Sequence, residues 1–135
     1  MEDLNLDKVI EILKNKFKVQ VIILFGSYAR GKQRNDSDVD IAFKSDEEFS
    51  RMQIWEMKNE IEDILNKEVD LINIDSEISE GFRYEILMSG KLIYVANKQE
   101  FEKYKLLKCS QYLTFNEDRK IIIDKIKKGG TLYGK

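Results

Sequence analysis

The sequence predicts an α/β (or α+β) fold in which a small mixed sheet of about four strands is flanked by helices. Segments whose apolar residues recur every three or four positions alternate along the chain with short, β-branched apolar runs. The 135 residues contain no proline and no linker-like tract. We therefore expect a single domain over 1–135, with a core at about 5–95 and a helical extension at about 98–128.

The composition narrows the possible functions. Hydrophobic residues make up 42% of the chain and charged residues 36%, which is typical of a globular protein. The net charge of -2 gives no general attraction for nucleic acid, so direct nucleic-acid binding is not expected. The apolar run from Val21 to Phe25 is too short to cross a bilayer, so no membrane association is expected.

Cysteine and histidine usage excludes several kinds of chemistry. The chain has one cysteine, Cys109, and no histidine, so it can form neither an internal disulfide nor a Cys/His metal cluster. A general base must then be a carboxylate, lysine, tyrosine or metal-bound group. This cysteine usage suits a reducing compartment, and a cytoplasmic location is expected.

The N-terminal part predicts one helix and two strands around a turn. Apolar residues at helical spacing predict an amphipathic helix over residues 5–17. The β-branched run from Val19 to Phe25 predicts a buried strand. Gly26 follows at once and permits a sharp turn. After a polar loop, Asp38 to Phe43 is typical of a second strand.

A second helix is predicted to follow. Ser45 and Glu48 form a capping-box pattern, with Ser45 as the N-cap residue. The helix is expected to continue to about residue 66. Trp55 occupies a core spacing on this helix and is expected to pack inside the protein.

The remaining sequence predicts two further strands and two helical segments. Glu68 to Ile74 is typical of a third strand, and the helix that follows is expected to end at Gly90. Lys91 to Val95 predicts a fourth strand. Residues 99–128 have a mostly helical pattern, with an interruption expected near 114–116.

Two aspartates carry the strongest chemical signal. On a strand, residues two apart project from the same face, so Asp38 and Asp40 are expected side by side while Val39 and Ile41 point toward the core. Adjacent carboxylates repel each other unless a cation lies between them. Mg²⁺ binds one or two carboxylates together with phosphate oxygens. One or two Mg²⁺ ions are therefore expected at this pair.

Gly26 and Ser27 are predicted to supply a phosphate site at the same edge of the sheet. The first strand ends here, and a helical turn is expected to begin. Backbone N–H groups at such a turn bind anions, and glycine allows a phosphate to approach closely. The Ser27 hydroxyl can add a hydrogen bond.

Asp70 is the third candidate ligand. It lies within the otherwise apolar run Val69 to Ile72, where an uncompensated charge is costly. A metal site shared with Asp38 and Asp40 explains its position. Asp70 can also accept the proton of an attacking hydroxyl, which matters in a chain without histidine.

For three other side chains, the sequence allows two roles each. Arg30 can bind a phosphate or form a surface ion pair. Tyr28 can pack in the core or line a nucleotide site. Arg83 is expected to lie at the surface, with a phosphate contact as the alternative.

Gly26 and Ser27, followed after ten residues by Asp38-Val39-Asp40, resemble the signature of the DNA polymerase β-type nucleotidyltransferase superfamily. The sequence from Gly26 to Gly31 resembles that of the minimal members of this superfamily. The stretch from Phe82 to Tyr94 resembles the usual end of the nucleotidyltransferase domain. The similarity spans roughly residues 5–95 and implies a polymerase β-like fold.

This resemblance implies a function and roles for the residues. Minimal nucleotidyltransferases accompany a HEPN ribonuclease toxin as its antitoxin, and transfer AMP from ATP to a toxin tyrosine. Asp38, Asp40 and Asp70 would then be the metal ligands and catalytic residues, with Gly26, Ser27 and Arg30 at the nucleotide. Transfer to a small-molecule hydroxyl, as in antibiotic-modifying enzymes, and steric inhibition of the toxin are the alternatives.

Overall fold

The computed structural model describes residues 5–29, 31 and 38–113, where helices and strands alternate as predicted. The elements are α1 (Leu6–Asn15), β1 (Val21–Phe25), β2 (Val39–Lys44), α2 (Arg51–Leu65), β3 (Val69–Asn73), α3 (Glu80–Ser89), β4 (Lys91–Val95) and α4 (Lys98–Leu113). The predicted fold class is confirmed. The rest of the predicted helical extension, with its interruption, lies outside the described residues.

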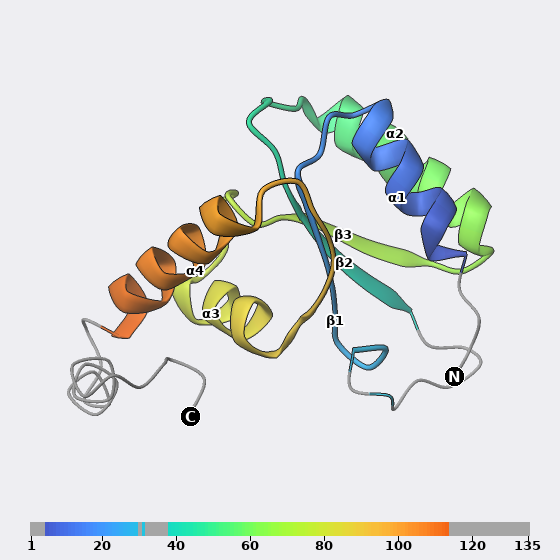
Figure 1. The fold of residues 1–135 in the computed structure, drawn as a ribbon. Helices are drawn as coiled ribbons and strands as arrows, with labels where there is room; N and C mark the ends of the chain where they lie inside the picture. Colours follow the sequence, from blue (N-terminus) through green and yellow to red (C-terminus); the bar gives the residue numbers. More distant parts are fainter. Residues whose placement is uncertain (1–4, 30, 32–37, 114–135) are drawn as a thin grey trace.

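The four strands form one mixed sheet in the order β3-β2-β1-β4. β1 pairs antiparallel with both β2 and β4, whereas β2 pairs parallel with β3. A parallel pair needs a crossover connection, and α2 provides it. Figure 1 shows α1 and α2 on one face of the sheet and α3 and α4 on the other.

Each face of the sheet has its own core, because successive strand residues point to opposite faces. The core under α1 and α2 contains mainly Val9, Leu13, Ile22, Leu24, Val39, Ile41, Phe43, Met57, Ile61 and Val69. The core under α3 and α4 contains Val21, Ile23, Ala42, Ile74, Ile86, Leu87, Phe101 and Cys109. The alternate residues of β1 and β2 are thereby assigned to opposite faces.

The predicted start of the second helix is wrong. α2 begins at Arg51, with Ser50 as its N-cap, and not after Ser45. Ser50 accepts a hydrogen bond from the Gln53 backbone N–H at 3.2 Å, and the Gln53 side chain accepts one from the Ser50 N–H at 2.8 Å. The Ser45 hydroxyl instead donates to the Lys18 carbonyl oxygen at 2.8 Å, which fastens the connection before the helix.

Trp55 is exposed, so the prediction that it packs in the core is wrong. Its exposed fraction is 63%. Met57, Ile61 and Leu65 recur every four residues and occupy the buried stripe of α2. Trp55 lies outside that stripe.

Arg83 is buried, so its predicted surface position is also wrong. Its Nε donates to the Ile74 carbonyl oxygen at 2.9 Å, and its Nη2 donates to that of Ser76 at 2.8 Å. Its Nη1 lies 3.1 Å from a Glu80 carboxylate oxygen. The guanidinium thus satisfies carbonyl groups of the chain that follows β3 and fixes α3 against it.

No helix among the described residues is long and apolar enough to cross a membrane.

Candidate active site

Asp40 and Asp70 are brought together by the parallel pairing of β2 and β3, in which they are register partners. Strands pair at a spacing of about 4.8 Å, so the two residues are direct neighbours. Ala42, two residues after Asp40, belongs to the core under α3 and α4. Asp40 and Asp70 therefore project from that face of the sheet, as the sequence predicts for a shared site.

Asp38 stands just before β2 and is exposed. Among the described residues, no three acidic or cysteine side chains are placed to form a ready-made metal site. The shared three-aspartate ligand set stays a prediction. The donors still fit Mg²⁺, because that ion takes one or two carboxylates and completes its octahedron with phosphate oxygens and water.

Gly26 directly follows β1 and has a φ of +74°, in the left-handed region that favours glycine. A Cβ built on Gly26 would lie 2.0 Å from Oδ2 of Asp40, where no side-chain atom fits. Only glycine therefore lets the Asp40 carboxylate lie against the turn. Gly26 was predicted to let a phosphate approach, and it also leaves space for the carboxylate of Asp40, a predicted metal ligand.

Residues 26–29 form a turn, and no helix lies between β1 and β2 among the described residues. The Gly31 N–H donates to the Tyr28 carbonyl oxygen at 3.3 Å. Tyr28 is 3% exposed and belongs to the core under α1 and α2, so the packing interpretation is the correct one. Arg30 lies outside the described residues.

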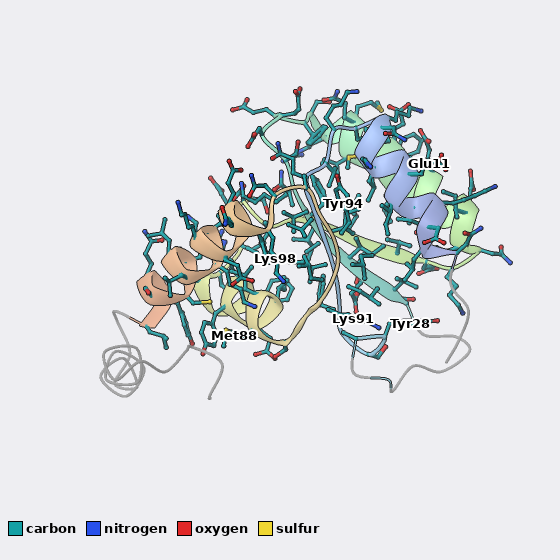
Figure 2. All side chains as sticks on the ribbon, in the orientation of Figure 1. Glu11, Tyr28, Met88, Lys91, Tyr94 and Lys98 are labelled. Carbon is teal, nitrogen blue, oxygen red and sulfur yellow. The ribbon has the colours of Figure 1, made fainter. Side chains whose placement is uncertain are left out.

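Tyr28 anchors this turn at the end of the sheet where β1 ends (Figure 2). Lys91, the register partner of Leu24, begins β4 at the same end of the sheet, but on the face of Leu24 and α1, opposite to that of Asp40. Its place depends on the pairing of β1 with β4, which no local pattern reveals.

The site therefore combines a glycine turn with two adjacent carboxylates on one face of a mixed sheet. The sequence model of the family described as "Polymerase beta, Nucleotidyltransferase" matches residues 7–99, more than half of the chain. This chain belongs to that nucleotidyltransferase family. The predicted superfamily is confirmed.

A relative from Shewanella oneidensis, the protein adenylyltransferase MntA, is 31% identical over 127 residues. The match covers 93% of this chain and 90% of the relative. That relative is a protein adenylyltransferase, and the predicted enzyme class is confirmed.

Two solved structures resemble the fold. One, a toxin–antitoxin complex with AMP-PNP, matches with a TM-score of 0.76 and 30% identity, over 92% of this chain and 99% of that chain. The other is a tri-AMPylated Shewanella oneidensis HEPN toxin in complex with its MNT antitoxin. It matches with a TM-score of 0.67 and 26% identity, over 90% of this chain and 94% of that chain. This nucleotidyltransferase therefore resembles proteins of toxin–antitoxin complexes in both sequence and fold.

Proposed function

We propose that this nucleotidyltransferase transfers AMP from ATP to a tyrosine of a cognate HEPN ribonuclease toxin and so inactivates it in the cytoplasm. The observation that carries the proposal is the contact between Gly26 and Asp40, with Asp70 as the register partner of Asp40. The AMP-PNP complex and the AMPylated toxin complex among its relatives support ATP as the nucleotide and a HEPN toxin as the partner.

The chain's own residues position the nucleotide in this reaction. The turn at Gly26 and Ser27 holds the triphosphate through backbone N–H groups and the Ser27 hydroxyl. Arg30 binds the phosphate tail. Asp38, Asp40 and Asp70 would hold Mg²⁺, which neutralises phosphate charge when bound.

The bond changes follow from these positions. The toxin hydroxyl oxygen attacks the α-phosphorus in line with the bond to the bridging oxygen, which breaks as pyrophosphate leaves. Asp70 accepts the hydroxyl proton, because its side chain is exposed on the reacting face and the chain has no histidine. The products are a toxin carrying AMP and free pyrophosphate.

A transfer assay tests the proposal. Wild-type chain at one-tenth of the toxin concentration, with ATP and Mg²⁺, should silence all of the toxin over time and add AMP mass to it. The double variant Asp38→Asn/Asp40→Asn should remain folded, because the replacements are nearly isosteric, and should transfer no label from α-labelled ATP. Label transfer by a folded double variant would show that other carboxylates carry the reaction.

The same titration separates transfer from steric inhibition. A steric antitoxin is needed at about one copy per toxin site, and its effect does not depend on ATP. Inhibition by the double variant at equimolar dose, unchanged without ATP, would overturn the catalytic proposal. Labelling of a small hydroxyl compound, with the toxin unlabelled, would indicate a small-molecule acceptor instead.

A further inference from the structure

Phe25 and Phe82 form an aromatic pair beside the carboxylates. Phe25 is the last residue of β1 and the register partner of Asp40 in the antiparallel pair. Directly opposed residues on such strands have Cβ atoms about 5 Å apart and share a face. The Phe25 side chain packs against the core under α3 and α4, which confirms that this is the face of Asp40.

Phe82 extends this aromatic surface from α3. Its ring centroid lies 5.8 Å from that of Phe25, and the two ring planes meet at 76°. Although it touches Phe25, Phe82 keeps 38% of its surface exposed. The neighbouring Arg83, Ile86 and Leu87 are the buried residues of α3, whereas the Phe82 ring stays partly open to solvent.

Exposure alone does not single out Phe82. The larger exposed apolar residues on α2 are Met52 and Trp55, and that helix covers the opposite face of the sheet. Leu106 and Leu107 lie on α4. Among the exposed large apolar side chains that the structure describes, Phe82 is the one in ring contact with a residue paired to Asp40.

We propose that Phe25 and Phe82 form the surface on which the purine base of the nucleotide stacks. This inference rests on the proposed function, in which the phosphates lie at Gly26 and Asp40. The ribose is the only link between base and α-phosphate, so the base must lie close to Asp40. The perpendicular rings form an apolar corner that offers one ring face for stacking and one ring edge for lateral contact.

Such a corner predicts a particular kind of specificity. Stacking depends on ring area and does not read hydrogen-bond patterns, so every base is accepted to some degree. Purines should bind more tightly than pyrimidines because their larger rings cover more of the aromatic surface. The corner therefore supplies affinity for ATP without excluding GTP.

A binding experiment with a base-free competitor tests the stacking surface. Dissociation constants for ATP and for inorganic tripolyphosphate, both with Mg²⁺, are measured for wild type, Phe82→Ala, Phe82→Leu and Phe82→Trp. We expect Phe82→Ala to weaken ATP binding by about 5-fold to 150-fold, the range that aromatic stacking spans. Tripolyphosphate binding should not change, because it has no base, and Phe82→Trp should bind ATP at least as tightly as wild type.

Two control variants distinguish the loss of the Phe82 ring from a general disturbance of the fold. Trp55→Ala removes an exposed aromatic ring on the other face of the sheet and should leave ATP binding unchanged. Phe82→Leu keeps apolar volume, so weaker ATP binding at an unchanged melting temperature assigns the effect to the aromatic ring. Equal ATP affinity in wild type, Phe82→Leu and Phe82→Ala would overturn the stacking surface while the proposed function stands. A wild type that binds neither ligand would overturn the proposed function, and the stacking surface with it.

Discussion

Replacing Gly26 with alanine tests whether the turn and the Asp40 carboxylate depend on each other. At a φ of +74°, an alanine costs about 1–2 kcal/mol of stability. Its Cβ would also lie 2.0 Å from Asp40 Oδ2, and real Cβ contacts essentially never fall below 3.0 Å. The carboxylate must therefore move by about 1 Å. A displacement of that size in a catalytic group can cost about 100-fold in rate, so we expect AMP transfer to fall by that factor.

Gly31→Ala is the matched control. Gly31 has a φ of +69°, and a Cβ built on it meets nothing within 4 Å among the described residues. Both variants should lose about 1–2 kcal/mol from backbone strain, measured by urea unfolding. Only Gly26→Ala should lose about 100-fold in the initial rate of label transfer from α-labelled ATP. Equal losses of activity in the two variants would refute the role assigned to the Gly26–Asp40 contact.

Two tyrosines give opposite predictions for stability. The buried Tyr28 hydroxyl has no hydrogen-bond partner among the described residues, so Tyr28→Phe should raise the free energy of unfolding by about 1 kcal/mol; a loss in urea unfolding would contradict this. The Tyr104 hydroxyl donates to Asp75 at 2.6 Å, so Tyr104→Phe should cost about 1 kcal/mol at pH 8. Burial and this hydrogen bond raise the pKa of Tyr104 above its ordinary value of about 10, so its contribution is complete below pH 10 and declines as pH rises further. The stability gap between wild type and Tyr104→Phe should then narrow between pH 8 and pH 11, and a constant gap would contradict the assignment.

The strands and the face on which Asp40 lies were the most predictable features of this chain. Each strand is a short apolar run with a clear end, such as Phe25 before Gly26 and Val95 at the end of β4. The two-residue period of a strand then assigns Asp40 to the face opposite Val39 and Ile41. The sequence predicts a site that Asp70 shares with Asp38 and Asp40, because a charge within an apolar strand is costly, and the register of β2 with β3 brings Asp40 and Asp70 side by side.

Features decided by tertiary contacts were not predictable in the same way. Two capping patterns compete before α2, one at Ser45 and one at Ser50. The Ser45 hydroxyl donates to the carbonyl oxygen of Lys18, 27 residues away in the sequence, and Ser45 does not cap the helix. Arg83 is similar, because its guanidinium binds carbonyl groups that only the folded chain brings to it. Local patterns carry no information about either contact.

Gly90 shows how a correct boundary can have a different physical cause. It ends α3 as predicted, yet its φ of -73° is one that any residue adopts. A Cβ at Gly90 would lie 2.4 Å from Ile23 Cγ2 and 2.5 Å from the Ile86 carbonyl oxygen. Glycine is needed there for close packing of α3 on β1, and not for a left-handed cap.

The arrangement of β2 explains how the fold tolerates two neighbouring carboxylates. Val39, Ile41 and Phe43 are at most 1% exposed and anchor the strand under α1 and α2. Asp40 lies between them on the opposite face, so its charge costs this core nothing. Like charges on paired strands repel each other, and the register pairing places the carboxylates of Asp40 and Asp70 side by side. Because one face of β2 secures the fold, the other face can hold two neighbouring carboxylates for the proposed nucleotide and metal site.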